Sequence, residues 1–205
     1  CLHWRTGRRS VLRSVTFFPP SEWRSKSYGP DHVSPAHPAV TVSDHGGGRW
    51  YNVHTDSAGS QHPDYRHFLI ENTSAPLGLY QCNPEHSSSG CNLEARNAKF
   101  LSIYGLKGES PIPIGRFIDC DHVRIFGYGG LASGKGPEDI LLDFRNTPNF
   151  LVANLIDRFM RRERNADKWH ILVDEQSPTA TARVLPLERP VLYRRGKPVA
   201  RPATD

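Results

Sequence analysis

The chain has 205 residues and carries 26 Lys and Arg against 21 Asp and Glu, which gives a formal net charge of +5. Hydrophobic residues make up 37% of it, and 17 Gly and 17 Pro favour a turn-rich β protein over a helical bundle. No apolar run approaches the roughly 18 to 20 residues of a membrane span, and the signatures of the common nucleic-acid modules are missing. We therefore expect no membrane span and no nucleic-acid partner.

The first part of the chain, residues 1–38, is expected to be an N-terminal extension with a candidate first strand at residues 11–17. Residues 39–42 and 49–54 are expected to be strands, because apolar and polar side chains alternate in them. Three glycines at 46–48 lie between them and suit a sharp turn, since glycine readily adopts positive φ.

The central part repeats one pattern four times, a short alternating run that ends in Asn or Asp. The runs end at Asn72, Asn97, Asp119 and Asn146, so the steps between them are 25, 22 and 27 residues. A second alternating run follows each of them, at 77–80, 101–104, 123–126 and 150–153. A fixed period in this range marks stacked supersecondary units, and the alternation indicates strands. The sequence predicts a repeated unit of strand, tight turn, strand and variable loop.

Asn and Asp at the equivalent turn have a physical cause, because their side chains tolerate the left-handed backbone conformation and bond nearby backbone groups. Stacked on one another, such side chains also form a hydrogen-bonded ladder. With this ladder, and with segments such as 97–108 and 121–130, the chain resembles the pectate-lyase-like superfamily of right-handed parallel β-helices. The resemblance covers about residues 39–157. It implies an all-β fold, a right-handed parallel β-helix with an Asn/Asp turn ladder and irregular ends.

The last part, residues 158–205, is expected to be a basic C-terminal cap or tail. Residues 150–155 are expected to be a strand, followed by a helical or irregular basic segment that carries five Arg and Lys between 158 and 168. Residues 169–173, 182–185 and 190–193 are expected to be short strands. They would form either a closing coil or a small antiparallel cap over the open end of the stack.

Alignment on the ladder sorts the first strands into two columns. The column that should point inward is small or apolar and comprises Phe68/Ile70, Leu93/Ala95, Gly115/Phe117 and Leu142/Phe144. The column that should point outward, with about 4.8 Å between strands, comprises Leu69, Glu94, Arg116 and Asp143.

Glu94, Arg116 and Asp143 are the first candidate catalytic set. The resemblance implies a polysaccharide groove built from outward side chains on consecutive coils. Two carboxylates beside a glycosidic bond can act as acid and base, or an Arg can neutralise a uronate and assist proton abstraction. The alternative is a salt-bridge ladder that only satisfies exposed strands.

Histidines beside the loops form a second candidate set. Its catalytic residues are His54, Tyr80 and His86, with Lys107 close by and His62 and His67 in the same loops. A His or Lys base with a Tyr acid suits β-elimination from a uronate, provided that the fold brings the groups together. The residues expected to bind substrate are Trp50, Tyr51, Lys107 and Tyr128.

The spacing of the histidines does not indicate a metal site. No His-x-His or His-x3-His pair occurs, so a defined metal site has weak support. The resemblance to pectate lyases implies Ca²⁺ as a candidate cofactor at Asp121, because Asp119 is assigned to the ladder. Cys82 and Cys91 bracket a polar loop, which a disulfide would close in an oxidising compartment.

Two functions follow from the resemblance. The first is an enzyme, a lyase or glycoside hydrolase that cleaves an anionic, uronate-containing polysaccharide outside the cell or at its surface. The alternative is a non-catalytic carbohydrate-binding or adhesin-type solenoid. An enzyme requires titratable groups that converge in a groove, whereas a binder requires exposed aromatic residues such as Trp50, Tyr51 and Tyr80 on one flat face.

Overall fold

The computed structural model describes residues 1–17, 36–55, 62–87, 89–109, 113–131, 136–157, 170–185 and 192–196. These residues form sixteen β-strands and no helix, which confirms the predicted all-β class. The strands are β1 (Leu2–Trp4), β2 (Val11–Phe17), β3 (Val40–Val42), β4 (Gly48–Thr55), β5 (Phe68–Glu71), β6 (Leu77–Tyr80), β7 (Asn83–Pro84), β8 (Leu93–Arg96), β9 (Leu101–Leu106), β10 (Gly115–Ile118), β11 (Val123–Gly130), β12 (Ile140–Arg145), β13 (Phe150–Asp157), β14 (Ile171–Ser177), β15 (Ala180–Val184) and β16 (Leu192–Arg195).

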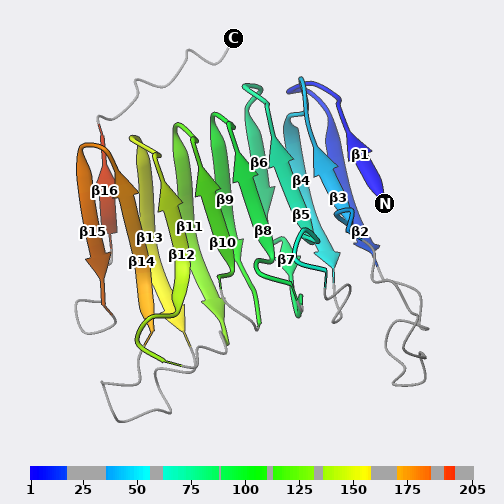
Figure 1. The fold of residues 1–205 in the computed structure, drawn as a ribbon. Helices are drawn as coiled ribbons and strands as arrows, with labels where there is room; N and C mark the ends of the chain where they lie inside the picture. The colour runs from blue at the N-terminus through cyan, green and yellow to red at the C-terminus, as the bar shows by residue number, and fades with distance from the viewer. Residues whose placement is uncertain are drawn as a thin grey trace, which may run out of the picture.

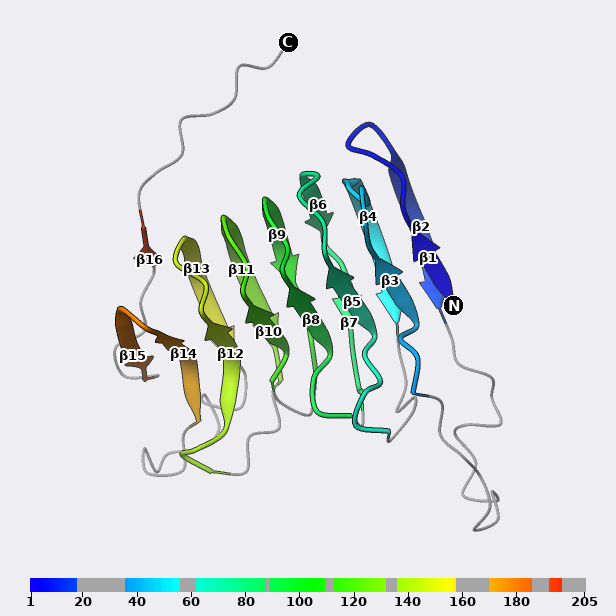
Figure 2. The ribbon, with the colours of Figure 1, turned by 45° about the horizontal axis from the view of Figure 1, so that its top comes forward.

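The strands form two sheets that face each other (Figures 1 and 2). Sheet A has the order β1-β3-β5-β8-β10-β12-β14-β15, and sheet B has the order β16-β13-β11-β9-β6-β4-β2, with β7 paired to β4. Neighbouring strands are parallel except that β15 and β16 are antiparallel to their neighbours. The chain passes from one sheet to the other, so we call one sheet-A strand and the sheet-B strand that follows it a level.

The strand register is the one that the repeat predicted. Leu93 pairs with Phe68 on one side and with Gly115 on the other, and Gly115 pairs with Leu142. The residues expected to point inward along this column are buried. The sheets also extend beyond residues 39–157, because β1 and β2 pair with β3 and β4, and β14 pairs with β12.

The Asn and Asp residues at the end of the sheet-A strands adopt the left-handed conformation that their residue type predicted. The φ angles are 51° at Asn72, 47° at Asn97, 53° at Asp119 and 47° at Asn146. Asn97 Nδ2 donates to Asn72 Oδ1 at 3.0 Å, and Asn146 Nδ2 donates to Asp119 Oδ1 at 2.6 Å. Asp44, with φ 59°, holds the equivalent place after β3 and was not anticipated.

Each long strand of sheet B bends at one residue with positive φ. The bends lie at equivalent positions, at Ser14, Asn52, Gly105, Gly127 and Asn154, and Gln81 has positive φ at the same place directly after β6. The bend leaves two successive residues exposed, Tyr104 and Gly105 in β9, and returns the next side chain, Leu106, to the interior. Sheet B therefore presents one outer surface before the bend and another after it.

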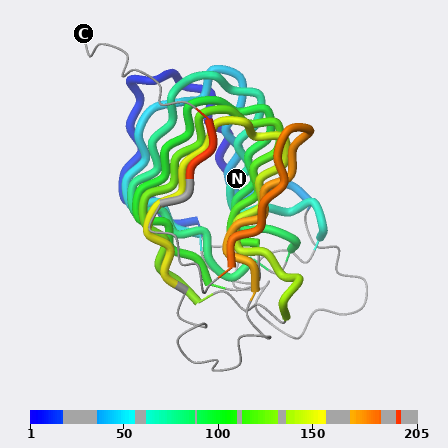
Figure 3. The backbone as a smooth tube through the Cα atoms, turned by 90° about the vertical axis from the view of Figure 1, so that its left-hand side faces the viewer, coloured from blue at the N-terminus to red at the C-terminus, as the bar shows by residue number. Residues whose placement is uncertain are grey.

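The interior between the sheets is apolar and partly aromatic. The rings of Phe117 and Phe144 stack with centroids 4.8 Å apart, and those of Phe144 and Phe150 lie 4.0 Å apart. Seen along the stacking direction, the backbones of successive levels lie nearly over one another around this interior (Figure 3). Full burial of a Phe side chain contributes about 1.5–3 kcal/mol, so this column is a main source of stability.

Both sheets end in an antiparallel strand on the C-terminal side, which agrees with the antiparallel alternative for residues 169–193. Glu175 of β14 is buried and forms a bidentate pair with Arg195 of β16, with Nε–Oε1 at 2.9 Å and Nη2–Oε2 at 3.1 Å. This ion pair joins the two sheets beyond the Phe144 level. The expected strand at 150–155 runs to Asp157, and the basic cluster from 158 to 168 lies outside the described residues.

The expected disulfide between Cys82 and Cys91 is not formed, because both cysteines are free. Cys82 belongs to the core between the sheets, whereas Cys91 lies close to Arg66 and Arg116. Burial is the main cause that raises the pKa of the Cys82 thiol to about 11 and that of Cys91 to about 12. The two thiols are therefore buried in different surroundings.

Candidate functional site

Glu94, Arg116 and Asp143 come together on the outer face of sheet A. Arg116 pairs in register with Glu94 on one side and with Asp143 on the other. Its guanidinium contacts both carboxylates, with Nε 3.1 Å from Asp143 Oδ2 and Nη1 3.8 Å from Glu94 Oε2. The structure thus brings together the three residues that the column aligned.

Both carboxylates are, however, covered by further arginines. Glu94 is 0% exposed and also contacts Arg66 Nε at 2.7 Å and Arg96. Asp143 is 4% exposed, and its Oδ1 forms an ion pair with Arg145 Nε at 2.5 Å. Sequence reasoning missed Arg96 and Arg145, although each lies two residues after its carboxylate and so on the same strand face.

The ion pairs continue along the outer face of sheet A into the C-terminal strands. Arg145 Nη2 lies 3.1 Å from Asp174 Oδ2, and Arg183 Nε lies 3.3 Å from Asp174 Oδ1. Arg183 also contacts Glu138 at 3.4 Å. We call the residues of this connected series the charge ladder. It comprises Arg66, Glu94, Arg96, Arg116, Asp143, Arg145, Asp174, Arg183 and Glu138. Its buried carboxylates are compensated by arginines, as the alternative of a cross-strand salt-bridge ladder requires.

The outer face of sheet B carries a stack of aromatic rings in register. The ring centroids are 4.8 Å apart for Tyr51 and Tyr80, 4.9 Å for Tyr80 and Tyr104, and 5.1 Å for Tyr104 and Phe126. The interplanar angles are 16°, 5° and 13°. The rings therefore cover one another's faces and turn their edges outward. We call these four residues the aromatic ladder.

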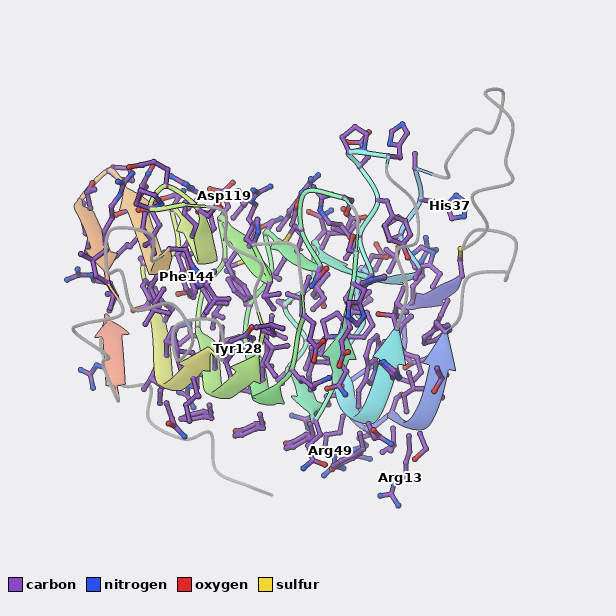
Figure 4. The ribbon with its side chains drawn as sticks, turned by 90° about the horizontal axis from the view of Figure 1, so that it is seen from below. Arg13, His37, Arg49, Asp119, Tyr128 and Phe144 are labelled. Atoms are coloured by element: carbon purple, nitrogen blue, oxygen red, sulfur yellow. The ribbon has the colours of Figure 1, made fainter. Side chains whose placement is uncertain are left out.

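Arginines flank the aromatic ladder. Arg13 Cζ lies 5.3 Å from the centroid of the Tyr51 ring, and Figure 4 shows Arg13 and Arg49 on the same side of the molecule. Arg49 and Arg124 belong to the neighbouring column, in which Gly78 and Ser102 lie between them. Beyond Arg124 this column continues with Leu151 and then Arg194. No carboxylate occurs among the described residues of these two columns, and no ion pair joins the four arginines to a described carboxylate.

The aromatic ladder changes the pKa of Tyr80, which stacks between Tyr51 and Tyr104. Burial raises the pKa of Tyr80 above its ordinary value of 10.0, and the neighbouring Tyr104 and Tyr51 raise it further. Arg49 lowers the pKa of Tyr80, because a cation favours the tyrosinate. Tyr80 is thus coupled electrostatically to both features of this face.

Two residues that were expected to bind substrate lie in the core instead. Trp50 is 0% exposed and packs edge-on against Trp4 and Phe68, because neighbours in a strand point to opposite faces and Tyr51 points outward. Tyr128 is 2% exposed, and its hydroxyl donates to Gly108 O at 3.1 Å. Figure 4 shows Tyr128 between the sheets, away from Arg13 and Arg49.

The second catalytic set is only partly assembled. Lys107 Nζ lies 2.6 Å from Glu85 Oε1 and 3.3 Å from Glu109 Oε1, and His86 Nε2 lies 3.3 Å from Glu109 Oε2. Burial lowers the pKa of Lys107, but the hydrogen bond and charge of Glu85, followed by those of Glu109, outweigh it and raise the pKa overall. We call Glu85, His86, Lys107 and Glu109 the rim cluster.

His54 and Tyr80 occupy different parts of sheet B. Tyr80 stacks between Tyr51 and Tyr104 before the bend, whereas His54 follows the bend at Asn52 and pairs in register with Asn83. His62 lies 3.8 Å from Asp64, and His67 is buried with its Nδ1 3.0 Å from the Tyr65 hydroxyl. Tyr80 therefore lies in the aromatic ladder and outside the rim cluster, and His54 does not share its position on the sheet.

Neither expected nor observed acidic groups fit a Ca²⁺ site well. Asp121 Oδ1 accepts from Asn149 Nδ2 at 2.6 Å, and its Oδ2 lies 2.8 Å from His122 Nδ1. Among the described residues, Asp121 is not part of a group that could hold a metal ion. Glu85, His86 and Glu109 offer ligand atoms within 4.8 Å of one another. The Lys107 ammonium already contacts both carboxylates, so a cation would have to displace it.

Comparisons with protein-family models, with curated proteins and with solved structures find no match to this chain. Within the described ranges, no helix is long and apolar enough to cross a membrane. The candidate sites therefore rest on the geometry of the two outer faces and of the rim cluster.

Proposed function

We propose that the chain is a right-handed parallel β-helix of the pectate-lyase-like type that binds an anionic polysaccharide outside the cell or at its surface. The strand alternation between two sheets, the parallel register and the left-handed Asn/Asp ladder support the fold. In this proposal the ligand lies on the outer face of sheet B, and the chain acts as a carbohydrate-binding solenoid.

The observation that carries this proposal is the composition of the sheet-B face. Four arginines lie there beside three tyrosines and a phenylalanine, without a carboxylate among the described residues of the two columns. Uncompensated cations raise the local concentration of anionic ligands. Arginine also forms bidentate contacts with carboxylates, the groups that a uronate offers.

The orientation of the rings favours a polyhydroxylated chain over a nucleic acid. Proteins that bind single-stranded nucleic acid offer open ring faces on which bases stack. In the aromatic ladder, Tyr80 and Tyr104 are covered on both faces by their neighbours. Their edges and hydroxyl groups remain for hydrogen bonds with sugar hydroxyls, repeated once per level.

The test is binding of polygalacturonate, with a neutral galactan and single-stranded DNA as comparison ligands, at low and high salt. We expect the wild-type chain to prefer polygalacturonate and to lose affinity as salt screens the arginines. Arg49→Ala should weaken binding, whereas Arg183→Ala removes the same charge from the outer face of sheet A and should not. Equal loss in both variants would show that net charge, not the sheet-B face, causes binding. Preference for DNA, or no binding at all, would overturn the proposal.

A second candidate function is cleavage of the same class of polymer at the rim cluster. The convergence of Lys107 and His86 on two carboxylates favours it. Protonated Lys107 would neutralise the uronate carboxylate, and His86 would take the C5 proton next to it. The C4–O bond would then break as the C4–C5 double bond forms, and the departing oxygen would take up the proton from the His86 imidazolium. Glu94 and Asp143 are less suited, because arginines already occupy both of them.

Product analysis after incubation with polygalacturonate, with and without chelator, separates the two functions. Unsaturated uronate ends that disappear in His86→Ala would establish a lyase, and loss with chelator would add a metal ion. Saturated oligomers would instead indicate a hydrolase. Absence of product from a folded protein that binds the polymer would leave the binding function alone.

A further inference from the structure

The two ends of the aromatic ladder differ. At one end, the Arg13 guanidinium lies over the Tyr51 ring, 5.3 Å from its centroid. At the other end, Phe126 pairs in register with Ala153, which has no ring to continue the stack. Phe126 is 36% exposed. The ladder therefore ends on a ring that no aromatic neighbour covers at the next level.

We call the space above Ala153, next to the Phe126 ring, the step. Neighbouring strands lie about 4.8 Å apart, so the Ala153 level offers roughly the thickness of one ring above a single methyl group. Leu151, two residues earlier in β13, points to the same outer face and is half-buried. Strand β16 pairs with β13 on the far side of Ala153, where Leu192 is the register partner of Ala153.

Arginines stand at this step as well. Arg124 precedes Phe126 by two residues on the same face of β11, and Arg194 pairs with Leu151. Neither forms an ion pair with a carboxylate of the described residues. A ligand that fits has one flat apolar face and an acidic substituent at its edge, which describes a uronate ring in a polysaccharide.

We propose that the step formed by Phe126 and Ala153 is a subsite for one uronate ring of the bound polysaccharide. The apolar face of the sugar packs on Phe126, and its carboxylate is held by Arg124 and Arg194. This assignment rests on the proposed binding function. It adds to that function a fixed position along the sheet, because the covered rings of the ladder offer no equivalent face.

The test places a larger side chain at residue 153, so that it fills the step. Ala153→Phe should add a fifth ring to the stack and displace the sugar, and Ala153→Ser is the matched control that leaves the step open. With tetragalacturonate as probe, we expect Ala153→Phe to weaken binding about tenfold, the scale of one lost stacking contact, and Ala153→Ser to bind as the wild type does. Phe126→Ala should weaken binding to a similar extent without filling the step. Circular dichroism and thermal melting establish that each variant is folded.

The outcomes separate this subsite from the binding function itself. If Arg49→Ala weakens binding of tetragalacturonate while Ala153→Phe and Phe126→Ala do not, the subsite is overturned and the binding function stands. If the wild type binds neither tetragalacturonate nor polygalacturonate, both are overturned. Saturation-transfer NMR provides a direct readout, since ring protons on the apolar sugar face should receive the strongest transfer in the wild type and lose it in Phe126→Ala. Uniform transfer to all sugar protons would contradict the stacking.

Discussion

The outer faces of the two sheets are built by the same stacking of equivalent residues but differ in charge. The carboxylates of sheet A are compensated by arginines, whereas the outer face of sheet B carries mainly arginines and aromatic rings. On both faces, parallel register places equivalent residues of successive levels above one another. On sheet A this aligns Glu94, Arg116 and Asp143, and Arg116 together with further arginines compensates the two carboxylates. On sheet B it aligns aromatic rings, and within the part of the chain that the structure describes, Arg49 and Arg124 pair with no carboxylate.

The buried carboxylates of sheet A distinguish its face from that of sheet B. Removing a carboxylate from water costs several kcal/mol unless close cations and hydrogen bonds compensate it. Glu94 is wholly buried and contacts three arginines, so its charge is already used within the protein. The sheet-B arginines, in contrast, form no ion pair with a carboxylate of the described residues. A charged row on a strand face is therefore informative about function only once its partners are known.

The largest expected effect is on the charge ladder. Glu94→Ala would leave Arg66, whose side chain is 7% exposed, without its carboxylate. Breaking a buried pair in this way costs about 3–5 kcal/mol, so we expect the free energy of unfolding in urea to fall by that amount. The control is Glu138→Ala, which removes a carboxylate that is 80% exposed from the same ladder. Its expected cost is below about 1 kcal/mol. Similar losses in both variants would contradict a structural role for burial on this face.

The next effect concerns the aromatic ladder. Tyr80→Ala removes a ring that stacks on both neighbours, and we expect a loss of about 1–2 kcal/mol in the free energy of unfolding, since the site is only partly buried. Tyr80→Phe keeps the stack and loses the hydroxyl group. It should keep the stability and weaken polygalacturonate binding. A large stability loss in Tyr80→Phe would show that the hydroxyl is structural and would remove it from the binding face.

A smaller effect on stability is expected for the arginines of sheet B. The double change Arg49→Ala and Arg124→Ala removes two side chains without described ion pairs, so the free energy of unfolding should change by less than about 0.5 kcal/mol. Binding of polygalacturonate should fall and become less sensitive to salt. A loss of stability comparable with that of Glu94→Ala would mean that the two faces do not differ as their contacts indicate.

The sequence predicted the features that depend on the repeat. Alternation and the Asn/Asp positions were enough to derive the register of β5, β8, β10 and β12 and the left-handed turns, because each residue's side depends only on its distance from the turn. The same reasoning placed Glu94 and Asp143 on the outer face. It did not reveal their burial, because Arg66 comes from the segment before β5 and no spacing along a strand predicts that contact.

The aromatic ladder could have been recognised in the sequence. Each of the runs 77–80, 101–104 and 123–126 ends in an aromatic residue, and alignment of those last positions places Tyr80, Tyr104 and Phe126 in one column. Trp50 was misplaced because Asp44 was not recognised as the ladder residue before β4. Counted from Asp44, Tyr51 takes the place that Tyr104 takes after Asn97, so Trp50 points into the interior.

The smallest expected effect tests both features of the sheet-B face with one titration. The pKa of Tyr80 is raised first by burial and then by Tyr104 and Tyr51, while Arg49 lowers it. Tyr104→Phe should therefore lower the pKa of Tyr80 towards 10.0, and Arg49→Ala should raise it further. Ring-labelled tyrosine followed by NMR against pH measures both shifts, with Tyr80→Phe to assign the signal.

The sign of the linked stability change follows from the same direction. Because the pKa of Tyr80 is higher in the folded than in the unfolded chain, its contribution to the free energy of unfolding is complete below pH 10 and is lost as pH rises through the folded pKa. Tyr104→Phe should reduce this alkaline loss and Arg49→Ala should increase it. Shifts of Tyr80 in the same direction in both variants would mean that the rings and the arginines do not share one face. Opposite shifts would place a cation and the stacked rings around the same hydroxyl.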